Sequence, residues 1–89
     1  MTSPRAGKAT VRYFGGAKAA AGTRLESVAV AEGTTVDDLV WLLASSHGDT
    51  LTRILTVSGL LLDEVAVRDR TVIVADGAVL DVLPPTAGG

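Results

Sequence analysis

The clearest helical pattern in the chain is the stretch TVDDLVWLLASSHG, residues 35–48. Thr35 is a good N-cap, and Asp38 stands three residues later, in the position of a capping box. Gly48 is a natural stop after the last helical turn. The apolar residues recur at the spacing i, i+3, i+4 and i+7, at Val36, Leu39, Val40 and Leu43. This stretch therefore predicts one amphipathic helix with a single apolar stripe.

Short segments rich in β-branched and aliphatic residues surround this helix on both sides. Strands are expected at 8–14, 24–30, 59–62, 65–67, 71–74 and 79–83. Between the first two, Gly15-Gly16 ends the strand, and Ala17–Ala21 can form a helical turn closed by Gly22. Residues 49–58 suggest a short second helical turn. The order predicts an α+β fold in which a mixed sheet packs on one main helix.

Composition limits what this chain can be. Its 89 residues allow one small domain, which we expect at 8–83, with a flexible N-terminal arm at 1–7 and an extended tail at 84–89. There is no cysteine and only one histidine, so we expect no disulfide scaffold and no metal site. A net charge of −2 argues against nucleic acid as a partner. The first residues lack the apolar run of a secretory signal, and no stretch is long enough to span a membrane. A soluble, cytoplasmic protein is therefore expected.

No common catalytic motif is present: the chain has no nucleophile elbow, no P-loop and no zinc-protease helix. His47 is most simply a polar residue favoured by the end of the helix dipole. Trp41 is adjacent to the apolar stripe, so we expect it at the edge of the core. Asp63, Glu64 and Asp69 are expected to form a solvated loop. The sequence therefore does not predict an enzyme.

The most informative feature is the end of the chain, Leu83-Pro84-Pro85-Thr86-Ala87-Gly88-Gly89. Pro84 and Pro85 cannot donate ladder hydrogen bonds, so they end the last strand and stiffen the exit from the domain. Six residues at about 3.3 Å each extend roughly 20 Å beyond the folded body. Gly88-Gly89 has no Cβ and can enter a channel too narrow for other residues. The group it delivers is the α-carboxylate of Gly89, which is ionised above a pKa of about 3.5. A frayed, glycine-rich end is the alternative interpretation.

At this point the sequence resembles the ubiquitin-like sulfur carriers of the MoaD/ThiS type, and most closely the small subunits of molybdopterin synthase. The resemblance covers roughly residues 8–89, and the tail is its strong motif. It is carried by Val11–Phe14, Thr35–Leu39, Val65–Asp69, and Asp76-Gly77 through Leu83–Gly89. The turn at Asp63-Glu64 departs from the family, where glycine usually stands second, and Ala78 stands where an acidic residue is common. These departures put the pathway in doubt more than the carrier role.

The resemblance implies a ubiquitin-like β-grasp fold and a carrier rather than an enzyme. In this family the terminal glycine, here Gly89, is adenylated with ATP by a partner resembling ubiquitin-activating proteins and is then converted to a thiocarboxylate with the help of a sulfurtransferase. The carrier itself binds no cofactor. Its tail enters the large subunit of molybdopterin synthase, in a heterotetramer, where the sulfur builds the dithiolene of the pterin.

By the same analogy, Phe14 and Leu83 belong to an apolar docking surface, together with the tail residues Pro84, Pro85, Thr86 and Ala87. Packing in the core is the equally supported alternative for Phe14. The net negative charge, with acids near the tail side, suggests engagement of a basic activating enzyme. Other interpretations are a sulfur carrier for thiamine or cysteine synthesis, a ubiquitin-like modifier joined to lysines of target proteins, and a binding module with an incidental tail.

Overall fold

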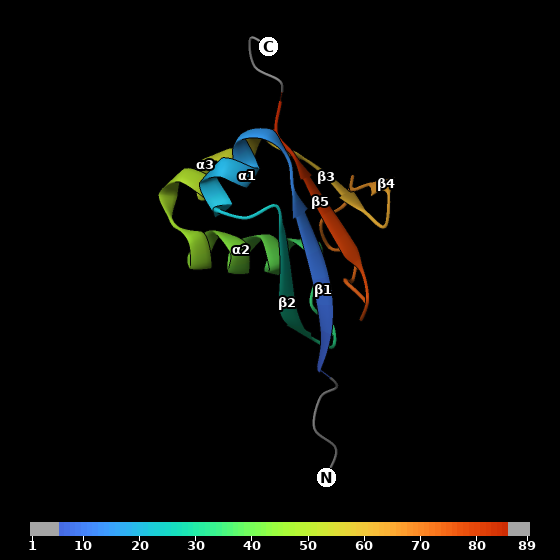
Figure 1. The fold of residues 1–89 in the computed structure, drawn as a ribbon. Coiled ribbons are helices and arrows are strands. Elements are labelled where there is room, and N and C mark those ends of the chain that lie inside the picture. The colour runs from blue at the N-terminus through green and yellow to red at the C-terminus, as the bar shows by residue number, and fades with distance from the viewer. Residues whose placement is uncertain (1–5, 86–89) are drawn as a thin grey trace.

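The computed structural model describes residues 6–85, which contain one five-stranded mixed sheet (Figure 1). The strands are β1 (Ala6–Tyr13), β2 (Leu25–Ala31), β3 (Gly59–Leu62), β4 (Val65–Ala66) and β5 (Val79–Leu83). They lie in the order β2-β1-β5-β3-β4. β5 runs parallel to β1 and antiparallel to β3, and the other neighbouring strands are antiparallel. The strand that leads into the C-terminal tail is therefore the central strand of the sheet, and the predicted mixed sheet is confirmed.

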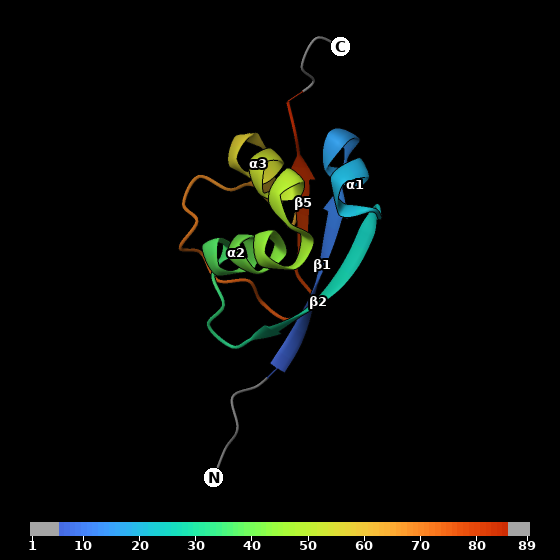
Figure 2. The same cartoon turned by 90° about the vertical axis from the view of Figure 1, so that its left-hand side faces the viewer.

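Three helices cover one face of this sheet, as Figures 1 and 2 show: α1 (Gly15–Ala21), α2 (Val36–His47) and α3 (Asp49–Val57). Strand alternation places every second side chain against them. The core is buried between the two layers and includes Ala9, Val11, Tyr13, Leu39, Leu43, Leu51, Leu55, Leu80 and Val82. The opposite face of the sheet has no helix on it within residues 6–85. No helix of this part is long and apolar enough to cross a bilayer.

The predicted main helix is confirmed, including both ends. The Thr35 hydroxyl accepts a hydrogen bond from the Asp38 backbone N–H at 3.1 Å, and the Asp38 carboxylate accepts one from the Thr35 N–H at 3.0 Å. This capping box satisfies two backbone groups that a helix start otherwise leaves unpaired. These hydrogen bonds hold the pKa of the Asp38 carboxyl below its ordinary value, chiefly through the Thr35 backbone. At the other end, Gly48 adopts a φ of +91°, and α3 begins at the next residue.

Four expectations from the sequence are corrected. Residues 49–57 form a complete helix, α3, rather than the short turn expected within 49–58, because Leu51 and Leu55 are both buried. β1 begins at Ala6, so two residues expected in the flexible arm at 1–7 belong to the sheet, and the rest of that arm lies outside the described residues. Trp41 is not at the edge of the core, since 69% of its surface is exposed.

The fourth correction concerns residues 71–74, which are not a strand of the sheet. They run past the beginning of α2 instead. The Val36 N–H donates to the Val72 carbonyl at 3.0 Å, and the Val74 N–H donates to the Thr34 carbonyl at 2.8 Å. A single bridge joins Thr35 to Ile73 in this region. The β-prone residues therefore satisfy the backbone of a helix start rather than a neighbouring strand.

Candidate functional site: the base of the C-terminal tail

The C-terminal tail leaves the domain from the end of β5, between β1 and β3 (Figure 1). The last ladder pair of β5 is Leu83 with Gly59. Pro84 is half-buried and Pro85 is exposed. A Cβ added to Gly15, the first residue of α1, would lie 3.6 Å from Cγ of Pro84, so α1 begins beside the tail. The tail therefore starts from a supported position. The remaining predicted site residues, Thr86, Ala87, Gly88 and Gly89, lie outside the described residues.

Phe14 and Leu83 lie side by side at this exit. The Phe14 N–H donates to the Val82 carbonyl at 3.2 Å, one residue beyond the ladder pair of Tyr13 with Val82. Tyr13 and Val82 point into the core. Because side chains alternate along a strand, the next residue of each segment points to the open face, which is the face of the sheet that carries no helix within residues 6–85. Phe14 is 42% exposed, and Leu83 is partly buried. Of the two interpretations of Phe14, the structure therefore disfavours packing in the core.

A partly buried ion pair lies next to these two residues on the open face. Arg12 donates from Nε and Nη2 to the two carboxylate oxygens of Asp81, at 2.5 and 2.7 Å. Asp81 is only 4% exposed, and its hydrogen bonds to Arg12 raise the pKa of the guanidinium above its ordinary value. The ladder places Leu25 beside Arg12 and Leu61 beside Asp81. The open face thus carries a charged pair, fully matched in geometry, between apolar neighbours.

The signals for this pair in the sequence are weak, because Asp81 appears there only as an interruption in an apolar strand. Both residues occupy alternate positions that point away from the helices. They are 69 residues apart and meet only because β5 runs parallel to β1. The useful signal was Asp81, the one charged residue of the otherwise apolar strand β5.

His47 also has a role that the sequence did not indicate. Its Nε2 lies 2.8 Å from Oε1 of Glu26, and the same oxygen accepts a hydrogen bond from the Tyr13 hydroxyl at 2.6 Å. The rings of Tyr13 and His47 meet edge to face, with centroids 5.9 Å apart. Burial, together with the hydrogen bond to Glu26, raises the pKa of the Tyr13 phenol. This network ties β1, β2 and α2 together beneath the sheet, away from the open face.

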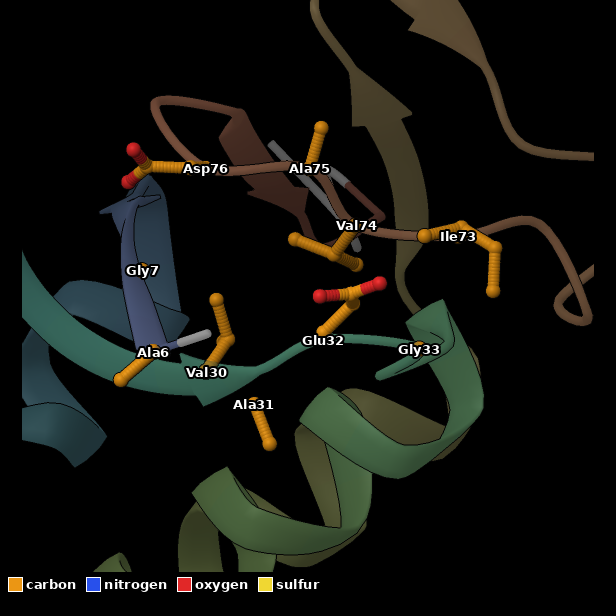
Figure 3. A pocket seen from close by; sticks show the side chains of 10 residues that line it. All are labelled: Ala6, Gly7, Val30, Ala31, Glu32, Gly33, Ile73, Val74, Ala75 and Asp76. Atoms are coloured by element: carbon orange, nitrogen blue, oxygen red, sulfur yellow. The ribbon is translucent and has the colours of Figure 1, made fainter. Parts of the chain in front are cut away.

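Two cavities lie at opposite ends of the paired strands β1 and β2. Figure 3 shows the one farther from the tail, a hollow of about 300 Å³ where β1 begins and β2 ends. Glu32 and Asp76 are the charged residues of its lining. The other, a cleft of about 420 Å³ near the tail, is lined by Arg12, Lys18 and Arg24 with Phe14 and Leu25. Within residues 6–85, no cluster of three or more metal-ligating side chains is present.

Comparison with known proteins identifies the family to which this chain belongs. The family model of the ThiS family matches residues 11–89. The crystal structure of small archaeal modifier protein 1 from Haloferax volcanii has a TM-score of 0.82 at 24% identity, over 93% of this chain and 100% of that chain. A putative molybdopterin converting factor, subunit 1, from Pyrococcus furiosus has a TM-score of 0.76 at 22% identity, over 90% and 99% of the two chains.

The subunit 1 and 2 complex of molybdopterin-converting factor from Helicobacter pylori also matches, with a TM-score of 0.70 at 23% identity, over 92% of this chain and 99% of that chain. A comparison with curated protein sequences gives no significant match. At these identities the structural neighbours show a shared fold, the ubiquitin-like β-grasp, as the sequence predicted. The family match covers most of the chain and includes the tail. The chain belongs to the ThiS family of ubiquitin-like sulfur carriers.

Proposed function

We propose that this protein carries sulfur on Gly89 for the synthesis of molybdopterin, as the small subunit of a two-subunit synthase. The observation that carries this proposal is the Pro-Pro-Thr-Ala-Gly-Gly end of the chain, which follows the central strand of the sheet directly. The exit lies beside an exposed aromatic side chain, Phe14. A partner that binds the open face therefore finds the base of the tail, Leu83–Pro85, at a defined place beside Phe14.

The chemistry needs two activation steps because a carboxylate is a poor electrophile. In the first, a carboxylate oxygen of Gly89 attacks the α-phosphorus of ATP on a partner adenylyltransferase and expels pyrophosphate. In the second, the outer sulfur of a sulfurtransferase persulfide attacks the acyl carbon and expels AMP, and a thiol then reduces the resulting acyl disulfide to release the thiocarboxylate. The large synthase subunit then holds the tail while the sulfur attacks the pterin precursor, and water cleaves the acyl–sulfur bond to return the carboxylate. The chain itself contributes the terminal group and its presentation, so the proposal makes it a carrier subunit rather than an enzyme.

Docking on the open face is the part of the proposal that the described residues support. Phe14 and Leu83 offer an apolar contact next to the exit, and Pro84 and Pro85 stiffen the first step of the tail. We propose that these four residues contact the large subunit, while Thr86, Ala87 and Gly88 pass through its channel. Small residues suit a narrow channel because they add little bulk.

The test is the intact mass of the protein after incubation with the adenylyltransferase, ATP and a sulfur donor. A carrier gains the difference between one sulfur and one oxygen, on the terminal residue. A sulfur carrier for thiamine or cysteine synthesis gains the same mass, but it then fails to support molybdopterin formation with the large synthase subunit. A ubiquitin-like modifier appears instead as larger conjugates on lysines. One structural neighbour from Haloferax volcanii is named a small archaeal modifier protein. An unchanged mass contradicts the proposal.

Two truncations, one at each end of the chain, provide the test and its control. Removing Gly89 takes away the reactive group, whereas truncating the arm by removing residues 1–5 leaves it in place. We expect the first variant to lose all sulfur loading with an unchanged melting temperature, because the domain core lies within residues 9–82. Loading that persists without Gly89 contradicts the carrier role.

A further inference from the structure

The cleft of about 420 Å³ near the tail carries an unusual combination of charge and apolar surface. Its lining comes from the end of β1, from α1 and from the beginning of β2: Arg12, Tyr13, Phe14, Gly15, Lys18, Arg24 and Leu25. Three of these residues are basic and none is acidic. Since the chain as a whole has a net charge of −2, this concentration of positive charge is local.

Two of the three cations have no counter-charge of their own. Arg12 is satisfied by Asp81, but neither Lys18 nor Arg24 forms an ion pair within residues 6–85. Lys18 and Arg24 are both exposed to solvent. Positive groups gathered around a concave surface raise the local concentration of anions and attract an acidic partner. The cleft is therefore a local basic surface near the tail, in a chain whose net charge is negative.

The same cleft presents apolar area between the charges. Phe14 is 42% exposed and Leu25 is 47% exposed, and each stands at the tail end of its segment. An aromatic side chain that is open to solvent beside a cation is a common anchor in protein interfaces. The cleft is therefore suited to a peptide segment that combines carboxylates with an apolar side chain, rather than to a small inorganic anion.

The cleft is also continuous with the exit of the tail. Gly15 lines it, and a Cβ on that residue would lie 3.6 Å from Pro84. Phe14 belongs both to the cleft and to the open-face contact described above. A protein that contacts the base of the tail at Pro84 therefore also lies beside the cleft.

We propose that this basic cleft binds an acidic segment of the protein that takes up the tail, with carboxylates paired to Lys18 and Arg24 and an apolar side chain placed between Phe14 and Leu25. The inference depends on the proposed function for the identity of the partner, since it names the chemistry by which that partner recognises the carrier. The contact steers the encounter and fixes the orientation in which the tail enters.

Binding is tested first without any partner enzyme. The probe is the synthetic peptide Asp-Asp-Phe-Asp-Asp, titrated into the full-length, isotope-labelled protein and followed by amide NMR shifts; Ser-Ser-Phe-Ser-Ser is the uncharged control peptide. We expect the acidic peptide to shift the amides of residues 12–25, and to bind more weakly as the salt concentration rises from about 20 to about 300 mM. Equal shifts from the two peptides, or shifts confined to other parts of the chain, overturn the proposal.

Matched charge variants make the test specific. Lys18→Ala combined with Arg24→Ala removes two exposed charges of the cleft, and Arg53→Ala combined with Arg68→Ala removes two exposed charges elsewhere. From the usual strength of exposed ion pairs, we expect the first double variant to bind the acidic peptide roughly tenfold more weakly and the second less than twofold. Equal losses in both, or no loss in either, contradict a defined cleft. Thermal unfolding of both double variants checks that the fold is retained.

The same variants separate this proposal from the carrier role. Sulfur loading of the wild-type protein, measured by intact mass, decides the carrier role alone. The first comparison is the rate of sulfur loading of the wild-type protein and of the Lys18/Arg24 variant, at a limiting concentration of adenylyltransferase. The second is the rate at which the large subunit consumes the sulfur from each. If both rates are equal for the two proteins, the cleft proposal fails and the carrier role stands. If the wild-type protein is never loaded, the carrier role fails, and the peptide titration still decides whether the cleft binds acidic segments.

Discussion

Replacing Phe14 by alanine distinguishes a docking residue from a packing residue. Full burial of a phenylalanine contributes about 1.5–3 kcal/mol, and 42% of Phe14 is exposed, so truncation costs about 1 kcal/mol of folding free energy. Leu80→Ala is the core control: Leu80 is 0% exposed, and comparable substitutions cost about 2–5 kcal/mol. For a domain of this size, each kcal/mol lowers the melting temperature by about 4–8 °C. Phe14→Ala should therefore lower it by several degrees, and Leu80→Ala by two to five times as much.

The same substitution should have a larger effect on binding than on stability. An aromatic anchor of an interface contributes about 2 kcal/mol, so calorimetric titration with the large synthase subunit should show a dissociation constant about thirtyfold higher for Phe14→Ala. Trp41→Ala is the matched surface control, because it removes an aromatic side chain that is 69% exposed on the helix layer. It should leave binding unchanged. The reasoning is refuted if Phe14→Ala unfolds as easily as Leu80→Ala, or if it binds as tightly as Trp41→Ala.

Three further predictions concern the scaffold. Because burial and Glu26 raise the pKa of Tyr13 above its ordinary value of 10.0, the unfolded chain loses this proton first as the pH rises; stability should therefore fall above about pH 10, and Tyr13→Phe should flatten that fall in urea titrations at several pH values. The pKa of the Asp38 carboxyl is lowered in the folded state, so its contribution to folding stability should be complete above pH 3.8 and lost as the pH falls further. Asp38→Ala should remove this dependence of the unfolding free energy on pH. An unchanged dependence in the variant would count against the capping box. Gly7→Val should lower the melting temperature, because a Cβ at this position lies 2.7 Å from Cβ of Asp76; Gly22→Ala, with open space around it, isolates the cost of a positive φ alone.

The sequence predicted α2 well because its signals are local. The capping residues Thr35 and Asp38 and the stop at Gly48 act within one helical turn of each end, so no tertiary information is needed to place them. The segment 71–74 shows the opposite case. Its β-branched residues favour an extended backbone, which they adopt, but the partner of that backbone is the start of α2. Propensity describes the conformation of a segment and does not name its partner.

The candidate site also combines features that local sequence predicts with features that depend on the tertiary fold. The tail motif follows from residues near one another in the sequence, so the end of β5 at the two prolines could be anticipated. The sequence left Phe14 open between core and docking surface, and its 42% exposure comes from the structure. The pairing of Arg12 with Asp81 could not, because it requires the parallel register of β1 and β5. The basic cleft depends on how α1 turns back beside β2, which brings Lys18 near Arg24. Net charge counted along the chain does not show this local concentration of basic residues.

The most direct measurement of the central claim is the mass of the C-terminal peptide after incubation with the adenylyltransferase, ATP and a sulfur donor. The account predicts that Gly89 exchanges one oxygen for sulfur, and that the large synthase subunit with its pterin substrate returns it to the carboxylate. A terminal peptide that keeps both oxygens, or whose sulfur is never consumed by that subunit, would contradict it.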